Sequence, residues 1–569
     1  MPSTDRLLSQ LEESRYRFGR AEAAHILRSL RKARAARFDD VPSLIRFHEV
    51  LLVLRAFPPS PAVLRAAVQL LEYFWTRVER LRKMGADMDE FDPLEVSGIA
   101  GTVMQDALGF DLARWLVQRL PGRVEIAWDD FDDERAMGAV WPRFLPLLSE
   151  DAAVEAEISW RKWLETAQGS RSLSPAWLIK RFDALPLPAI EKSRLYESLH
   201  MPILWRLANS RISRTRSARP VRNIFFHTEP LLTRKDVSLD AELRRKPPAL
   251  VLLSLKQGRD VIDLIREVML VRYRELYGTT LGDPRSVVRA DVGRGVTIYL
   301  WGLPPERRLP LRAYIAGVTL KNGVPINYIE AIGLFEWMEI GFNTFYTYRG
   351  GEVAWIFAQV LRCLTAHMGT SCVSMYPYQL GHKNEEAIES GAFWFYRKLG
   401  FRPGRADLVK LVEREEKKIA SDPKYKTRAR TLRRLAQGHA FYELPGSAAC
   451  AWDRFSTRNI GLRVNRAMAQ EFDGDLERFK KAATQRLSRL LQERVPRESE
   501  ASYSAFYDFA MVAWLVAELS SWTSEQKKAL SMIIHAKAGR DEMAYLRLLQ
   551  EHYWLRRAML RLGSASSIP

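Results

Sequence analysis

The chain has 569 residues, a formal net charge of +19 and a sequence pI near 9.8. That length is too great for a single hydrophobic core, so we expect two to four domains. The three cysteines exclude a disulfide framework and lack metal-binding spacing, and no run of 18 apolar residues occurs. Because the first residues also lack an apolar signal core, we expect a cytoplasmic protein with no metal site and no membrane contact.

Residues 1–205 are expected to form a helical domain. Apolar residues recur at three- and four-residue spacing in Leu44–Phe57, Ala62–Val78 and Gly109–Leu120, with charged residues between them. This pattern predicts an all-α N-terminal region. Six tryptophans are expected to anchor its core, and the alternative is that they form a platform on which nucleic-acid bases stack: Trp115, Trp128, Trp141, Trp160, Trp163 and Trp177.

Residues 206–248 are predicted to be an arginine-rich linker that crosses between domains. Five arginines stand here among Ser, Thr and Pro residues: Arg211, Arg214, Arg216, Arg219 and Arg222. One interpretation is a solvated linker. The other is an arm that binds the phosphates of a nucleic acid, so that binding depends on salt. The net charge is compatible with both.

Residues 249–412 are predicted to form an α/β domain with one mixed, mainly antiparallel sheet. Lys321-Asn322-Gly323 is a hairpin signal, because Asn-Gly accepts positive φ. The expected strands are Ala249–Leu255, Val296–Trp301, Leu311–Leu320, Val324–Phe335, Glu339–Thr347 and Cys372–Tyr376. The expected helices are Asp260–Tyr277, Gly282–Asp291, Glu352–His367 and one that carries Phe393–Leu399.

Residues 413–569 return to helical periodicity, which predicts an all-α C-terminal region. The expected helices are Leu411–Ala420, Arg428–Gln437, Asp475–Glu493, Ala505–Leu519, Ser524–Ala536 and Met543–Leu562.

The loop Arg349–Ala354 is a candidate anion site at the start of a helix. Free N–H groups and the helix dipole favour an anion there, and Gly350 and Gly351 allow the backbone to form a tight nest. The alternative is a strand-to-helix turn without a ligand, in which Glu352 serves as an acid at the helix N-terminus.

With Tyr396–Phe401, which reads Tyr-x-x-x-Gly-Phe, this loop resembles the GNAT-type N-acyltransferases over about residues 250–401. The resemblance implies that acetyl-CoA or another acyl-CoA binds with its diphosphate on the loop, and that Tyr396 protonates the leaving thiolate. It implies that Asn384 contacts coenzyme A, although Asn384 also suits a helix N-cap. Glu352 stands where the family has Gly. The implied diphosphate-binding residues are Arg349, Gly350, Gly351, Val353 and Ala354.

An N-acyltransferase also needs a base that removes a proton from the attacking amine. The candidates are three acids on or near the central strands: Glu330, Glu339 and Glu336. Alternation along one strand would place Glu330 and Glu336 on the same face of the sheet.

The sequence therefore predicts an acyl-CoA-dependent N-acyltransferase that acts on an unknown amine, with macromolecular acceptors included. One alternative is a catalytically degenerate GNAT-like protein that binds nucleic acid. Another is a transferase that takes an aminoacyl group from charged tRNA. The arrangement of an α/β domain between helical regions also resembles that of large uncharacterised bacterial proteins. This resemblance indicates a fold but no substrate.

Overall fold

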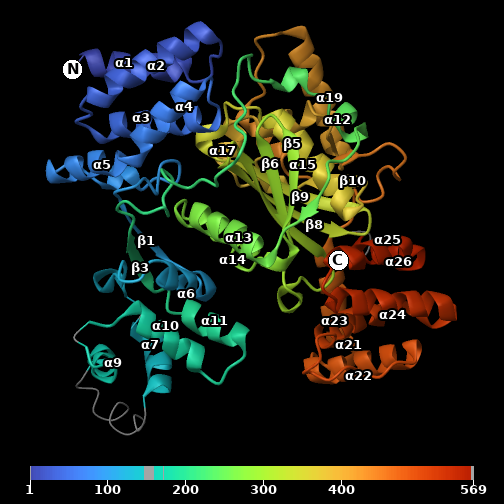
Figure 1. Cartoon of the computed structure of the whole chain (residues 1–569). Helices are drawn as coiled ribbons and strands as arrows, with labels where there is room; N and C mark the ends of the chain where they lie inside the picture. Colours follow the sequence, from blue (N-terminus) through green and yellow to red (C-terminus); the bar gives the residue numbers. More distant parts are fainter. Residues whose placement is uncertain (1, 133, 146–158, 171, 565–569) are drawn as a thin grey trace.

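A nine-stranded sheet lies at the centre of the protein in the computed structural model, which describes residues 2–132, 134–145, 159–170 and 172–564 (Figure 1). The strand order is β11-β12-β10-β9-β8-β7-β6-β5-β4. The β9–β10 pair is parallel and the other seven pairs are antiparallel, which confirms the predicted mixed, mainly antiparallel sheet. The strands are β4 (Val251–Leu252), β5 (Val288–Gly293), β6 (Val296–Trp301), β7 (Ala313–Lys321), β8 (Val324–Leu334), β9 (Trp337–Thr344), β10 (Cys372–Met375), β11 (Arg402–Pro403) and β12 (Ala440–Glu443).

The turn between β7 and β8 has the predicted hairpin form. Lys321 pairs with Val324, and the two residues between them, Asn322 and Gly323, have φ angles of 49° and 81°. Asn and Gly tolerate this left-handed conformation at least cost. The hairpin is therefore specified by its own four residues.

Helix α15 (Val353–Met368) connects β9 to the parallel strand β10 and covers one face of the sheet. The ring of Phe357 lies 5.1 Å from that of Phe342 on β9. Gly369 ends the helix in the left-handed conformation. The predicted helix Glu352–His367 is confirmed to within one residue.

Two predictions at the start of this region were wrong. The segment predicted as helix Gly282–Asp291 contains a 3-10 turn (Pro284–Ser286) followed by β5, because its alternating residues pair with β6. The strand predicted for Ala249–Leu255 is limited to the two exposed residues of β4. The side chains of Ser254 and Gln257 form a capping box there, which starts α13 at Leu255.

The prediction of an all-α N-terminal region was also wrong. Strands β1 (Val103–Ala107), β2 (Val124–Ile126) and β3 (Pro202–Arg206) form a three-stranded antiparallel sheet in the order β1-β3-β2. Because β3 pairs with strands that lie about 80 to 100 residues earlier, local periodicity could not reveal it. The helices of this region are α1 (Pro2–Ser14), α2 (Arg20–Ala35), α3 (Val41–Ala56), α4 (Pro61–Glu72), α5 (Phe74–Lys83), α6 (Phe110–Arg119), α7 (Glu134–Val140), α9 (Trp160–Gln168), α10 (Pro175–Ala184) and α11 (Ala189–Glu197).

The C-terminal region is not all-α, because β12 inserts between β10 and β11. Its residues Ala440 and Phe441 are buried against both neighbours, so a strand of four residues is stable there. The predicted helix Met543–Leu562 is divided at His552, whose ring accepts the N–H of Leu555 and caps the second part. The remaining helices are α12 (Leu239–Arg244), α13 (Leu255–Leu270), α14 (Tyr277–Thr280), α16 (Pro377–Leu380), α17 (Glu385–Glu389), α18 (Ala392–Arg397), α19 (Ala406–Ser421), α20 (Ala429–Leu435), α21 (Thr457–Phe472), α22 (Leu476–Leu491), α23 (Tyr503–Trp514), α24 (Ser524–Ala538), α25 (Glu542–Glu551) and α26 (Tyr553–Gly563).

Two hydrophobic clusters hold these elements together. The larger one joins the buried residues of α1–α5, the central sheet and the C-terminal helices. The smaller one is built mainly from residues 104–212, which form a separate group around β1 and β3 in Figure 1. Among the described helices, none combines the length and apolar character that a membrane span requires.

Candidate functional site

The glycines of the Arg349–Ala354 loop pack against the N-terminal helices. A Cβ atom on Gly350 would lie 2.6 Å from the ring of Tyr16, and one on Gly351 would lie 2.7 Å from the ring of Phe57. Tyr16 follows α1, and Phe57 ends α3. The close approach that these glycines permit is therefore made by aromatic side chains of the protein itself.

Glu352 places a carboxylate beside the start of α15. Its side chain is fully buried; Oε1 is ion-paired with Arg294 and accepts the N–H of Leu232 at 3.2 Å, and Oε2 lies 3.3 Å from Nζ of Lys321. Lys321 is itself fully buried. Two cations and one anion thus form a closed cluster behind the loop.

The titration behaviour of this cluster follows from burial and charge. Burial alone would raise the pKa of Glu352, but the Arg294 hydrogen bond and the Lys321 charge hold that pKa below its usual value. Burial lowers the pKa of Lys321 to about 8, against the opposing effect of Glu352. The Glu352 carboxylate is therefore ionised at neutral pH. It neutralises part of the positive charge of Arg294 and Lys321 that would otherwise attract a bound diphosphate.

The other residues predicted to hold coenzyme A have partners within the chain. Arg349 is ion-paired with Glu386 and lies 3.9 Å from the ring centre of Tyr346. Val353 and Ala354 form the first turn of α15, where Ala354 is buried. Arg349 and Ala354 therefore already contact other residues of the chain at the positions where coenzyme A was expected.

Asn384 occupies the N-cap of α17. Its Oδ1 accepts the N–H of Ala387 at 3.2 Å, and its Nδ2 donates to the carbonyl of Tyr378 at 3.1 Å. Both ends of the amide are therefore used in local structure, as the N-cap interpretation expects.

Tyr396 lies in a hydrophobic environment on α18. Its side chain is 5% exposed, and its ring centre lies 5.5 Å from that of Phe357 and 5.8 Å from that of Phe401. Burial raises the pKa of the Tyr396 hydroxyl, so the group holds its proton more firmly than a free phenol.

Glu330 and Glu339 lie on one face of the sheet, opposite to α15. Glu330 on β8 is paired in register with Gly341 on β9, so Glu339 is its diagonal neighbour. Glu330 accepts a hydrogen bond from the hydroxyl of Tyr314, and Oε2 of Glu339 lies 2.9 Å from Nε2 of His439. Both carboxylates are half-buried. The structure thus brings two of the predicted acids together.

The β9–β10 pairing ends beside these acids. Its last pair is Ile340 with Met375, whereas β9 continues to Thr344 in pairing with β8. Among the residues that the structure describes, no strand pairs with the other edge of β9 at the level of Glu330.

Glu336 does not share a strand face with Glu330, so that expectation was wrong. β8 ends at Leu334, and the chain turns at Phe335, whose φ is 53°. Glu336 is ion-paired with Arg556 on α26 and accepts the indole N–H of Trp452 at 2.8 Å. These contacts assign it a structural role.

The five arginines of the predicted linker divide into two groups. Arg214 is 3% exposed and donates to the carbonyls of Leu94 and Glu95, so it is a core residue and the expectation of a fully solvated segment was wrong. The other four reach the surface and are called here the arginine surface: Arg211, Arg216, Arg219 and Arg222.

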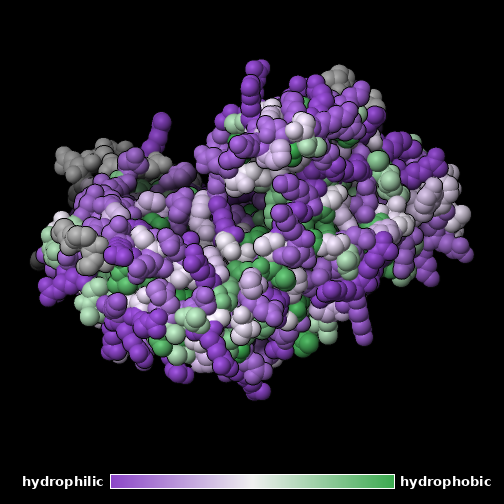
Figure 2. All heavy atoms as spheres, turned by 90° about the horizontal axis from the view of Figure 1, so that it is seen from above, coloured by the Kyte–Doolittle hydropathy of each residue, from purple (hydrophilic) through white to green (hydrophobic). Residues whose placement is uncertain are grey.

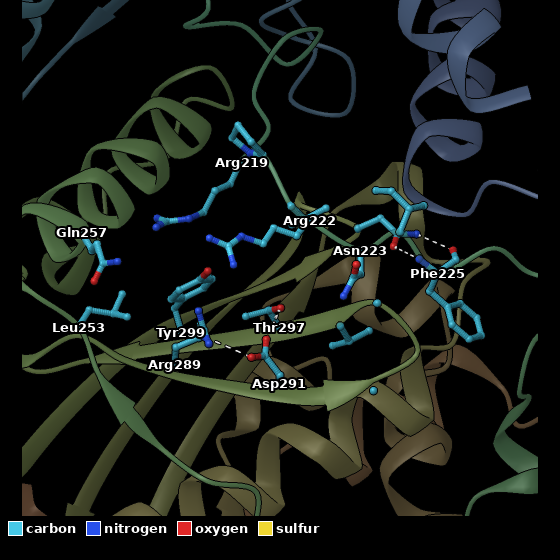
Figure 3. A pocket seen from close by; sticks show the side chains of 17 residues that line it. Arg219, Arg222, Asn223, Phe225, Leu253, Gln257, Arg289, Asp291, Thr297 and Tyr299 are labelled. Atoms are coloured by element: carbon cyan, nitrogen blue, oxygen red, sulfur yellow. Dashed lines mark hydrogen bonds and ion pairs between the residues drawn. The ribbon is translucent and has the colours of Figure 1, made fainter. Parts of the chain in front are cut away.

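A cavity of about 910 Å³ lies between this segment and the edge of the sheet. Figure 3 shows Arg219 and Arg222 extending over β5 and β6, with Tyr299 beneath them. Among the described residues, neither guanidinium has a carboxylate partner. The face in Figure 2 is mostly hydrophilic and is hollowed between two lobes.

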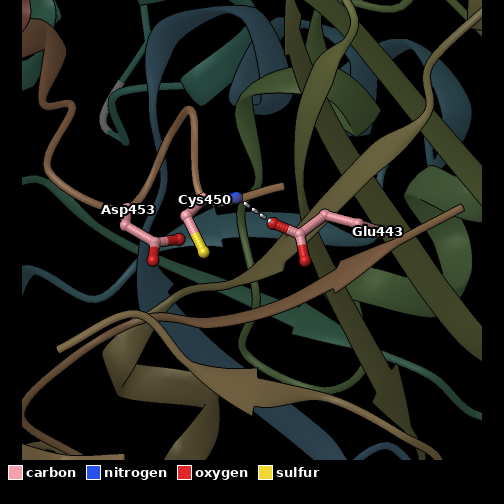
Figure 4. Close-up of side chains that lie close together, drawn as sticks. All are labelled: Glu443, Cys450 and Asp453. Atoms are coloured by element: carbon pink, nitrogen blue, oxygen red, sulfur yellow. Dashed lines mark hydrogen bonds between the residues drawn. The ribbon is translucent and has the colours of Figure 1, made fainter. Parts of the chain in front are cut away.

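Glu443, Cys450 and Asp453 form a cluster whose potential ligand atoms lie within 4.8 Å of one another (Figure 4). Arg402 is ion-paired with both carboxylates, at 2.9 Å from Asp453, and the N–H of Cys450 donates to Glu443 at 2.8 Å. The Arg402 guanidinium therefore already neutralises Glu443 and Asp453, as a bound metal ion would.

Sequence reasoning missed the floor of the large cavity, which includes Tyr299 and Gln257. Tyr299 belongs to an apolar strand pattern, and Gln257 belongs to a helix cap, so neither carried a signal of its own. Their proximity to Arg219 arises from tertiary structure. Comparisons with family models, with curated proteins and with solved structures found no match for this chain.

Proposed function

We propose that the protein binds nucleic acid through its arginine surface. The observation that carries this proposal is the pair of guanidinium groups of Arg219 and Arg222, which face a cavity of about 910 Å³ without a carboxylate partner among the described residues. Unpaired arginines at a surface are suited to phosphate oxygens, which they bind with two parallel hydrogen bonds.

A second cavity continues the arginine surface. Arg211 and Arg216 line this cavity of about 440 Å³, to which Arg219 also contributes, and its other ionised lining residues are Arg119, Asp260, Asp263 and Glu267. The two cavities therefore adjoin along one segment of chain. The net charge of +19 favours association with a polyanion at long range.

The closed loop at α15 weighs against a diphosphate at that position. Glu352 already pairs with the two nearby cations, Arg294 and Lys321, and Tyr16 and Phe57 occupy the space next to Gly350 and Gly351. Binding of coenzyme A in the expected manner would require the N-terminal helices to move and a buried ion pair to break.

The test is fluorescence anisotropy of the full-length protein with labelled single-stranded RNA, single-stranded DNA and duplex DNA over a range of salt. If four arginines each neutralise one phosphate, a plot of the logarithm of affinity against the logarithm of salt concentration should have a slope of about −2.8 for single strands and about −3.6 for duplex DNA. Replacing all four residues of the arginine surface with Gln should remove most of that slope.

A matched control removes the same charge from another surface. Arg428, Arg430, Arg433 and Arg434 are exposed on and beside α20. Their fourfold replacement with Gln should leave binding almost unchanged. Equal weakening by both fourfold variants, or the absence of binding at low salt, would refute the proposal.

Acyl transfer is a second candidate function, favoured by the two carboxylates beside the end of β9, where β10 no longer pairs with it. Glu330 or Glu339 would act as base, with acyl-CoA as donor, or with aminoacyl-tRNA if the arginine surface binds the tRNA. Calorimetry with acetyl-CoA tests whether acyl-CoA is the donor. If aminoacyl-tRNA is the donor and Glu330 is the base, Glu330→Gln should abolish transfer from charged tRNA without weakening tRNA binding.

A further inference from the structure

We infer that the cavity beneath residues 219–225, called here the arch, binds one nucleotide: a phosphate with its attached nucleoside. The nucleotide can be free or can be one unit of a strand, and the second case rests on the proposed function. Four features carry the inference: the fixed backbone of the arch, its charge, the polar groups around the cavity, and the cavity's size.

Both ends of the arch are fixed to the β7–β8 hairpin. The N–H of Arg219 donates to the carbonyl of Gly323 at 2.8 Å. At the other end, Oδ1 of Asn322 accepts the N–H of Phe225 at 2.8 Å, and Nδ2 of Asn322 donates to the carbonyl of Phe225 at 3.0 Å. Arg222 lies between these anchors, so its backbone position is set before any ligand arrives.

The first anchor requires a glycine. Gly323 has a φ of 81°, and a Cβ atom there would lie 2.1 Å from the carbonyl oxygen of Arg219. A side chain at this position would therefore push the arch away from the hairpin.

The charge of the cavity matches a phosphate dianion. Arg219 and Arg222 contribute two positive charges that have no carboxylate partner in the described parts of the chain, and the Arg219 guanidinium lies 5.4 Å from the ring centre of Tyr299. The other ionised lining residues, Arg289 and Asp291, are paired with each other at 3.2 Å, and Asp291 also accepts the hydroxyl hydrogen of Thr297 at 2.8 Å. The net charge of +2 that remains is available to a ligand.

The remaining groups suit a nucleoside. The hydroxyl of Tyr299 and the amide of Asn223 have no hydrogen-bond partner among the described residues and face the cavity in Figure 3. Gln257 uses its oxygen to accept from Ser254, which leaves its NH₂ group for a ligand. Apolar lining residues include Val221 and Leu253. A volume of about 910 Å³ lies within the usual range for small-molecule sites.

The experiment is calorimetry of the full-length protein with AMP, GMP, CMP and UMP, and with inorganic phosphate and adenosine as separated parts. At least one nucleotide should bind roughly tenfold more tightly than either phosphate or adenosine. Arg222→Gln should lower that affinity by roughly tenfold. Because Arg222 is exposed, this variant should fold normally.

Arg428→Gln is the matched control, since Arg428 is an exposed arginine beside α20 that belongs neither to the arginine surface nor to the lining of this cavity. It should leave nucleotide affinity unchanged. Gly323→Ala should lower nucleotide affinity while circular dichroism shows the native helix content. If phosphate alone binds as tightly as every nucleotide, or if Arg428→Gln weakens binding as much as Arg222→Gln, the inference is overturned.

The outcomes also separate this inference from the proposed function. Strands that bind through the arginine surface, with no mononucleotide bound, would overturn the nucleotide site and leave nucleic-acid binding intact. Mononucleotides that bind when no strand does would support the site and remove the proposed function.

Discussion

Replacement of Glu352 by Gln tests whether this carboxylate balances buried charge at the start of α15. The change keeps the shape of the side chain and a hydrogen-bond acceptor for Leu232, but it removes the counter-charge of Lys321 and Arg294. Lys321 is fully buried. Loss of one partner of a buried ion pair costs about 3–5 kcal/mol, and we expect about 3 kcal/mol because the acceptor remains.

The pH dependence of this loss has a defined sign. The pKa of Lys321, about 8 in the folded protein, will fall further without Glu352. A lysine with a lowered pKa in the folded state makes stability rise with pH, because the unfolded chain then binds more protons. The deficit of Glu352→Gln relative to wild type should therefore shrink between pH 7 and pH 9.

Urea unfolding followed by tryptophan fluorescence measures the effect, with Glu386→Gln as control. Glu386 makes the same kind of pair with Arg349, but both side chains are 37% exposed, so its loss should cost less than about 1 kcal/mol. Equal midpoints for the two variants at pH 7 would refute the reasoning. So would an increase in the wild-type midpoint on addition of acetyl-CoA, since that requires an accessible cofactor site.

Three further predictions concern stability. Gly323→Ala should destabilise the protein by about 1–3 kcal/mol in urea unfolding, because it combines a positive φ with a clash against Arg219. Burial raises the pKa of Asp508 to about 6, so its charged form costs stability above that pH; Asp508→Asn should stabilise by about 2–3 kcal/mol at pH 8 and by almost nothing at pH 4. Arg214→Gln should lower the thermal midpoint measurably, because it removes a buried guanidinium that holds the carbonyls of Leu94 and Glu95, whereas replacement of the exposed Arg211 by Gln should not.

Local signals in the sequence predicted local structure well. Asn322-Gly323 specified its hairpin, and the apolar spacing of Glu352–His367 specified α15. The failures were elements that depend on distant partners. β12 has no distinctive pattern over four residues and is stabilised by β10 and β11, which lie earlier in the chain.

The candidate site shows the same division. The sequence identified Glu352 as unusual, but its partners Arg294 and Lys321 are 58 and 31 residues away, so its ion pairs could not be foreseen. Likewise, Arg214 resembles its neighbours in composition, and only folding separates it from the exposed Arg222. Residue type indicated charge, and tertiary contacts decided whether that charge was available.

The side-chain amide of Asn322 has a practical consequence for experiments on shortened chains. It contacts the carbonyl of Ala56 at 2.9 Å as well as the arch, so the hairpin depends on residues that precede position 249. A fragment that begins there would lose these partners, together with Tyr16 and Phe57 over Gly350 and Gly351. Binding of coenzyme A to such a fragment would reflect a loop, Arg349–Ala354, that truncation has uncovered. Binding and activity should therefore be measured on the 569-residue chain.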